Sequence, residues 1–213
     1  MTWEIWIAYV IACTILLAVP GPTIMLVITH ALTRGRQTGL YTVPGVILGD
    51  TAALILSLAG LGAILSLSAN LFTAVKLIGA AYLIYLGVQM WRSASDPLPA
   101  VDRQDKPIID GKTGWRLGLH AFAVTTLNPK GIVFFIAFLP QFIVASAPVV
   151  PQLFLLGATF VVLGGINAAI YAILAGSLNK WLHRPGWMRA VNRIGGGFLI
   201  GAGVTMVAMR RSA

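Results

Sequence analysis

The chain repeats itself with an offset of 116 residues, and this repeat constrains the fold more than any other feature of the sequence. Residues 49–53 align with residues 165–169, and residues 78–84 align with residues 194–200 at the same offset. Each copy of the repeat contains three long apolar segments. Two units with an odd number of membrane spans, joined in one bilayer, must lie upside down relative to each other. Such inverted repeats are typical of secondary transporters.

The composition indicates a membrane protein. Hydrophobic residues make up 58% of the 213 positions, charged residues only 10%, and the mean hydropathy is +0.87. Because about 20 apolar residues cross a bilayer, six segments qualify as spans: residues 3–29, 40–66, 71–91, 117–144, 150–174 and 190–209. We predict an all-α integral membrane protein whose six transmembrane helices form two inverted three-helix repeats. The repeats are residues 1–92 and 115–213, joined by a cytoplasmic linker at residues 93–114.

The basic residues predict which loops face the cytoplasm. The net charge is +9, but Lys and Arg lie in short loops without a continuous basic face, which argues against nucleic acid as a partner. Eleven of them fall in or beside the loops after the first, third and fifth spans, and the opposite side holds only Lys76, Arg210 and Arg211. By the positive-inside rule, both termini are expected to be extracytoplasmic.

Two spans are interrupted at corresponding places. The interruptions are Pro20, Gly21 and Pro22 in the first span, and Asn128, Pro129 and Lys130 in the fourth. Proline removes a backbone donor, so each helix must kink or unwind there. Matched breaks in inverted halves indicate a binding site, because freed carbonyls and half-helix ends offer partial charges near the middle of the bilayer. In the alternative interpretation, each proline merely bends a helix to fit its neighbours.

Two charged residues lie inside predicted spans, Asp50 in the second and Lys130 in the fourth. A charge near the bilayer centre costs about 2.5–3.5 kcal/mol on insertion scales, so it normally faces a cavity or a partner. In the functional interpretation, Lys130 and a half-helix N-terminus hold a carboxylate, while Asp50 holds an ammonium group or carries a proton. In the structural alternative, the two residues form an ion pair that locks the halves together.

Other polar and small residues are weaker candidates. Asn167 is assigned to the binding site because it lies one residue beyond the repeat position of Asp50. Thr125, Thr126 and Gln141 are secondary candidates, and each can equally be a hydrogen-bonding group between helices. The pairs Gly45/Gly49 and Gly197/Gly201 have the small-xxx-small spacing that predicts close helix packing.

No metal or cofactor is expected. His30, His120 and His183 are scattered without the spacing of metal ligands. Cys13 is the only cysteine, which rules out a disulfide within the chain and argues against a thiolate metal site.

Taken together, these motifs resemble one protein family. The matching motifs are Pro20-Gly21-Pro22, Gly45 with Gly49-Asp50, residues 79–83 with Leu86-Gly87, Asn128-Pro129-Lys130, and Phe138 with Pro140-Gln141-Phe142. They resemble the LysE/RhtB family of bacterial amino-acid exporters over essentially the whole chain, and most closely its homoserine and threonine branch. The resemblance implies six spans in the bacterial inner membrane and efflux of a small amino acid coupled to proton motive force. Homodimers are compatible with it.

The substrate and some alternatives stay open. One acid and one lysine in the membrane favour a neutral zwitterion over a dibasic amino acid. The resemblance implies homoserine, its lactone, threonine or leucine as substrates, while export of basic amino acids is the alternative. A channel is disfavoured because no span carries a polar stripe. The predicted spans place no nucleophile with a base, and no group of metal ligands, at one membrane depth, so catalysis is not expected. A membrane scaffold without transport activity would tolerate Lys130→Met, whereas a transporter would not.

Overall fold

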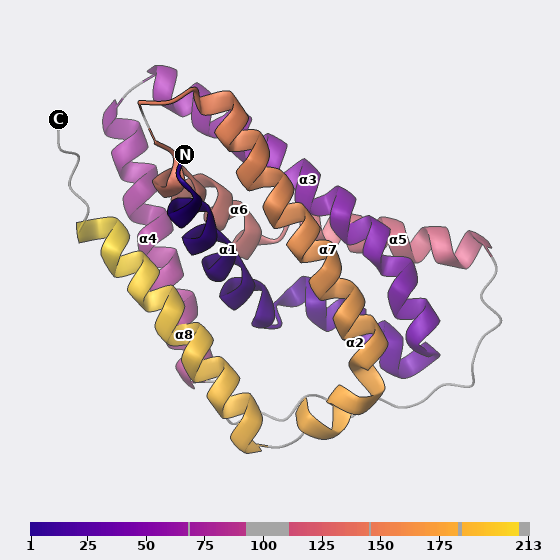
Figure 1. Ribbon diagram of the computed structural model, residues 1–213. Coiled ribbons are helices and arrows are strands. Elements are labelled where there is room, and N and C mark those ends of the chain that lie inside the picture. Colours follow the sequence, from indigo (N-terminus) through magenta and orange to yellow (C-terminus); the bar gives the residue numbers. More distant parts are fainter. Residues whose placement is uncertain (68, 93–110, 145, 183–184, 209–213) are drawn as a thin grey trace.

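A computed structural model describes residues 1–67, 69–92, 111–144, 146–182 and 185–208 of the chain (Figure 1). All regular secondary structure in these ranges is helical, as predicted. Residues 93–110 of the predicted linker, His183 and the C-terminal residues 209–213 lie outside the described residues. The last four residues predicted for the linker, 111–114, are helical.

The first half consists of four helices. They are α1 (Trp3–Ala18), α2 (Pro22–Arg34), α3 (Arg36–Leu67) and α4 (Ala69–Arg92). The axes of α1 and α2 are bent by 52° at the predicted break. Because Pro20 and Pro22 have no N–H, they cannot bond the carbonyls four residues earlier, and α1 ends at that point. Gly35, with a φ of 96°, supplies the left-handed turn between α2 and α3.

The second half has a similar order of elements. They are α5 (Gly111–Thr126), α6 (Pro129–Val133), the π-helix η1 (Phe134–Phe138), the 3₁₀-helix η2 (Leu139–Phe142), α7 (Val149–Leu182) and α8 (Pro185–Ala208). The segments Thr113–Thr126 and Pro129–Phe142 meet at 44°. The two breaks have the same local arrangement. In each, an N-cap residue, Gly21 or Asn128, precedes a helix whose first residue is proline. Proline suits that position, where the N–H has no helical partner in any case.

Several of these helices are long and apolar enough to cross a membrane. By length and composition, the candidate spans are Arg36–Gly62, Thr73–Arg92 and Val149–Ala175. The number rises from three to five if each bent pair counts as one span. Among the described residues, α8 is not a candidate by this measure, so five of the six predicted spans have a counterpart.

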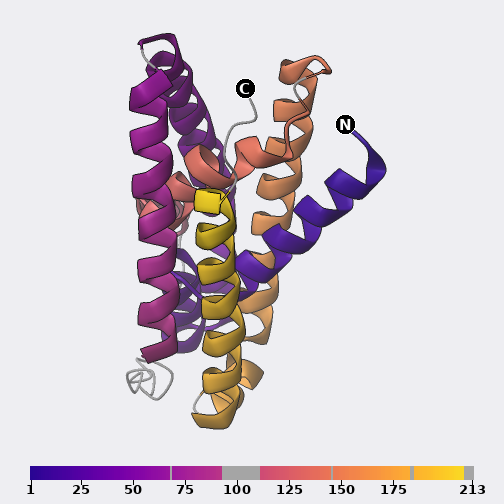
Figure 2. The same cartoon turned by 90° about the vertical axis from the view of Figure 1, so that its left-hand side faces the viewer.

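Corresponding helices of the two halves lie side by side and run in opposite directions (Figures 1 and 2). Along α3 and α7, Ile47 faces Gly165 while Leu54 faces Gly157. Along α4 and α8, Gly87 lies against Gly196, and residues 80–84 lie against Gly203. Figure 2 also shows α1 slanting across the bundle toward the break that it shares with α2.

Glycines allow α3 and α5 to approach to backbone contact. A Cβ atom on Gly45 would overlap the carbonyl oxygen of Gly118, and one on Gly49 would lie 2.7 Å from the Cβ of Thr125. The predicted packing role of Gly45 and Gly49 is therefore confirmed. The prediction for the second pair was wrong, because a Cβ on Gly197 or Gly201 would meet nothing within 4 Å. The close approach of α4 to α8 depends on Gly87, Gly196 and Gly203 instead.

An aromatic core sits beside the second break. The π-helix turns Phe134, Phe135 and Phe138 into the bundle, where Phe134 and Phe135 pack against Phe160 of α7 with ring centroids 5.1 and 4.7 Å apart. On the other side, the buried ring of Tyr9 from α1 lies 6.1 Å from that of Phe134. π-helical turns often occur at functional sites, and Phe160 of this core also lines the cavity described below.

Candidate functional site

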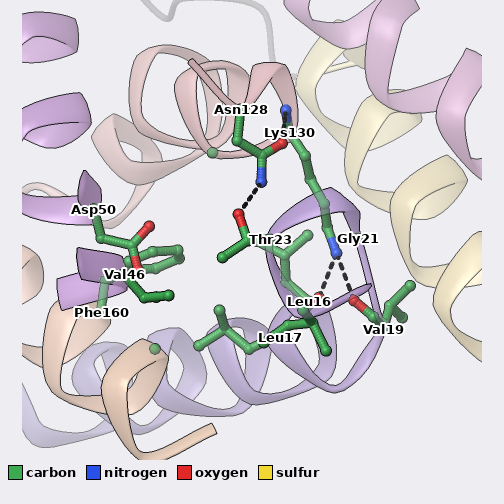
Figure 3. A pocket seen from close by; sticks show the side chains of 13 residues that line it. Leu16, Leu17, Val19, Gly21, Thr23, Val46, Asp50, Asn128, Lys130 and Phe160 are labelled. Atoms are coloured by element: carbon green, nitrogen blue, oxygen red, sulfur yellow. Dashed lines mark hydrogen bonds between the residues drawn. The ribbon is translucent and has the colours of Figure 1, made fainter. Parts of the chain in front are cut away.

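The two helix breaks border one cavity (Figure 3). Val19 and Gly21 line it from the first break, and Asn128 and Lys130 from the second. The space open to the centres of water molecules is about 50 Å³. Since one water needs about 10–15 Å³ by this measure, the cavity has room for a few waters.

The structure brings the predicted site residues together, although they play different parts. Gly21, Asp50, Asn128 and Lys130 line the cavity. The prolines at positions 20, 22 and 129 shape the backbone of the breaks. Asn167 lies on α7 and hydrogen-bonds to the end of α1. Further lining comes from Thr23 and Ile24 of α2, Val46 of α3, and Phe160 and Gly164 of α7.

Asp50 is a buried carboxylate without a partner. Its side chain is 8% exposed, and among the described residues it forms no hydrogen bond or ion pair. Gly164 makes room for it, since a Cβ on that glycine would lie 2.7 Å from Oδ2 of Asp50. A buried, unpaired acid is costly unless a cation or a proton joins it. The direct ion pair with Lys130, one of the two alternatives above, is not formed; the two side chains lie on opposite sides of Thr23 in Figure 3.

Lys130 instead binds the end of α1. Its Nζ donates hydrogen bonds of 2.7 Å to the carbonyl of Leu16 and 3.0 Å to the carbonyl of Val19. A cation at this place also complements the negative end of the helix dipole. Lys130 therefore joins the two halves of the chain, through backbone carbonyls rather than through Asp50.

Two side chains of α7 complete this contact. Asn167 Nδ2 donates to the carbonyl of Leu17 at 3.0 Å, and the Tyr171 hydroxyl donates to the carbonyl of Ala18 at 2.7 Å. The last carbonyls of a helix normally lack partners. Here side chains of the second half donate hydrogen bonds to the backbone carbonyls of all four residues 16–19.

Thr23 is the centre of a small polar network between α2 and the second break. Its hydroxyl accepts hydrogen bonds from Asn128 Nδ2 at 3.2 Å and from Thr125 Oγ1 at 3.3 Å. Asn128 Oδ1 in turn accepts the backbone N–H of Lys130 at 3.1 Å. This network fixes the start of α2 against the start of α6.

The other secondary candidates lie farther from the cavity. Thr126 reaches the carbonyl of Gly49 at 3.5 Å, a weak interaction. Gln141 bonds the carbonyl of Ala137, four residues earlier. The rings of His30 and His120 lie 6.3 Å apart, closer than their sequence positions suggested. Within the described ranges, no group of three potential metal ligands occurs.

The start of α2 presents free donors to the cavity. No side chain caps this helix, and within the described part of the chain the backbone N–H groups of Thr23 and Ile24 have no hydrogen-bonding partner. Such groups, together with the positive end of the helix dipole, form a natural anion site. The cavity therefore offers a place for a negative group at α2 and one for a positive group at Asp50.

Sequence reasoning missed three residues of this region: Thr23, Gly164 and Tyr171. Thr23 follows Pro22 as Lys130 follows Pro129, so aligning the two breaks on their prolines would have found it. Tyr171 lies four residues after Asn167, on the same helix face. No local signal distinguishes Gly164 from other glycines in the spans.

The fold and the site define a class of protein. Long apolar helices, two broken spans and a buried charged cavity between the halves are features of a membrane translocator of small polar molecules. The chain belongs to the LysE type translocator family, whose model matches residues 14–210. This confirms the resemblance drawn from the motifs.

Curated relatives match over their full length. The chain is 32% identical to a homoserine/homoserine lactone efflux protein of Salmonella typhimurium and 33% identical to one of Salmonella typhi, covering 100% of both chains in each case. An uncharacterized membrane protein of Vibrio cholerae is 31% identical over 99% of this chain and 100% of its own. No solved structure matches the chain.

Proposed function

We propose that this protein is an inner-membrane secondary transporter that exports a small neutral amino acid or a derivative such as homoserine or its lactone. One observation carries the proposal: an unpartnered buried carboxylate and the uncapped start of a half-helix line the same cavity. A zwitterion such as homoserine presents both of the complementary charges, whereas its lactone presents the ammonium group and an uncharged ester. The similarity to homoserine/homoserine lactone efflux proteins of two Salmonella species supports amino-acid efflux.

The proposed architecture is six spans in two inverted repeats, with α8 as the sixth span and both termini extracytoplasmic. The opposite directions of α3 and α7, and of α4 and α8, support it. The equivalent caps of the two breaks, Gly21-Pro22 and Asn128-Pro129, are further support. An inverted pair of halves can exchange roles, and this exchange opens the cavity to one side of the membrane at a time.

In the proposed binding mode, the substrate carboxylate accepts hydrogen bonds from the free N–H groups at the start of α2, with Lys130 as its counter-charge. The substrate ammonium group binds Asp50 beside Gly164. Val46 and Phe160 line the cavity with apolar surface, which favours a short, uncharged side chain. The carbonyls of residues 16–19 are not assigned to the amine, because Lys130, Asn167 and Tyr171 already donate hydrogen bonds to them.

Asp50 also accounts for coupling to protons. One carboxylate cannot hold a proton and pair with an ammonium group at the same time, so the two compete. When the proton and the substrate compete for a single site that opens to one side at a time, the two are exchanged. The substrate leaves the cytoplasm as a proton enters it. The cavity must widen to admit an amino acid, because it holds only a few waters in this arrangement.

Transport by purified protein is the direct test. Vesicles with the cytoplasmic face outward and an acidic interior should take up labelled homoserine, threonine or leucine in exchange for protons, but not lysine or arginine. Uptake should stop when the pH gradient is collapsed with an uncoupler. Correctly inserted protein that takes up no member of the panel would contradict the proposal.

Gly164→Ala should weaken substrate binding without unfolding the protein. The added Cβ, 2.7 Å from Oδ2 of Asp50, would displace the carboxylate from the position where it meets the ammonium group. We expect the half-saturation concentration to rise about tenfold, equivalent to ~1.4 kcal/mol. Gly201→Ala is the matched control, because its Cβ meets nothing within 4 Å. Equal half-saturation in both variants would remove Gly164 from the site.

A further inference from the structure

The broken end of α1 is held entirely by the other half of the chain. Four consecutive carbonyls, those of residues 16–19, accept hydrogen bonds from Lys130, Asn167 and Tyr171. We call these three side chains the clasp. Lys130 follows the second break, whereas Asn167 and Tyr171 lie one turn apart on α7.

The first break creates the need for the clasp. In a continuous helix the carbonyls of Leu16 and Ala18 would bond the N–H groups at positions 20 and 22, but both positions are proline. Inside a bilayer no bulk water replaces such partners, so an unsatisfied carbonyl is costly. The end of α1 is therefore stable in this place only while the clasp is closed.

The carbonyls of α1 and the proposed substrate carboxylate compete for the donors of Lys130. Its ammonium group bonds the carbonyls of Leu16 and Val19, and Lys130 also lines the cavity that contains the proposed carboxylate site. An ammonium group has three donors, and two of them are already directed at α1. Full engagement of a substrate carboxylate requires Lys130 to turn away from those carbonyls.

We propose that the clasp is the latch of the transport cycle: binding of the substrate carboxylate draws Lys130 from the carbonyls of α1 and releases the end of that helix. Asn167 and Tyr171 are positioning residues that set how firmly α1 is held. The proposal rests on the proposed function, since it names the step by which that site would be coupled to movement. Under this proposal, α1 is the helix that moves when substrate binds.

The latch has a consequence for affinity. If substrate binds only after the clasp opens, the apparent affinity is reduced by the fraction of molecules in which it is closed. A weaker clasp should therefore bind substrate more tightly. A substitution that merely loosens the fold would have the opposite effect or none.

Tyr171→Phe tests the latch with a minimal change, because it deletes one hydroxyl and the bond to Ala18 while keeping the ring. Cys13 on α1 is the only cysteine of the chain and is fully buried, so it reports release of this helix in the otherwise native protein. In vesicles without substrate, we expect N-ethylmaleimide to label Cys13 about threefold faster in the variant, the effect of one hydrogen bond within a membrane. Tyr85→Phe on α4 is the matched control, because Tyr85 is 59% exposed and is not part of the clasp.

The same variant should have a half-saturation concentration for uptake about threefold lower than that of the wild type. Lys130→Met provides a second variant, in which labelling of Cys13 should rise more than in Tyr171→Phe because two bonds to α1 are lost. Wild-type labelling and wild-type half-saturation in Tyr171→Phe, alongside normal uptake by the native protein, would overturn the latch and leave the proposed function intact. Absence of uptake by the native protein would instead overturn the proposed function.

Discussion

Asp50→Asn is expected to abolish proton-coupled efflux while the protein still inserts at normal levels. The amide keeps the shape of the side chain but carries no charge for an ammonium group and no acid group that takes up and releases a proton. Removing one partner of a buried charge pair typically costs about 3–5 kcal/mol, so substrate uptake should fall about a hundredfold or more. Uptake of labelled substrate into vesicles with an acidic interior measures the loss.

Two variants separate charge from structure in this test. Thr51→Val changes the next residue, whose hydroxyl only bonds the carbonyl of Ile47 on its own helix, and should transport normally. Asp50→Glu keeps the charge but moves it by one methylene, and should retain part of the activity. Normal transport by Asp50→Asn, at wild-type levels of protein in the membrane, would remove Asp50 from the mechanism.

Gly45→Ala is expected to prevent α3 and α5 from packing. The new Cβ would occupy the position of the Gly118 carbonyl oxygen, and neither helix backbone can yield there without separating the pair. Overpacking of this kind costs about 1–3 kcal/mol even where side chains can adjust. We expect a lower thermal midpoint in detergent and less folded protein in the membrane, measured by fluorescence-detected size exclusion after heating.

Gly60→Ala is the control on the same helix. Its Cβ would meet nothing within 4 Å, and alanine has the higher helix propensity, so the variant should be at least as stable as the native chain. Equal thermal midpoints for the two variants would show that α3 and α5 do not need backbone contact at Gly45.

The two breaks were predictable because their cause is local. At both breaks, proline stands beside a residue that helps to end a helix: Gly21 lies between Pro20 and Pro22, and the capping Asn128 precedes Pro129. A lone proline is not sufficient, since Pro44 lies inside α3 without ending it. The all-helical class followed from long apolar segments in the same direct way. The repeat predicted which breaks correspond, and the caps Gly21 and Asn128 have equivalent positions in the structure.

The partners of the buried charges were not predictable to the same degree. Asp50 and Lys130 were expected to face a cavity or each other, and both line the cavity without pairing. Whether the two side chains pair or face a cavity depends on distances across the bundle, which a sequence pattern does not contain. The same limit applies to the glycine pairs: Gly45/Gly49 and Gly197/Gly201 have equal spacing, yet only the first pair meets another backbone.

By itself, the sequence determined the membrane class, the family motifs and the places where two helices break, because apolarity and the missing proline donor act on each segment separately. Only the tertiary structure decided that Lys130, Asn167 and Tyr171 hold the end of α1 and that Asp50 is left without a partner. Hydrogen bonds act over about 3 Å, so their pairing depends on which helix faces lie together. That arrangement is a property of the whole packed bundle.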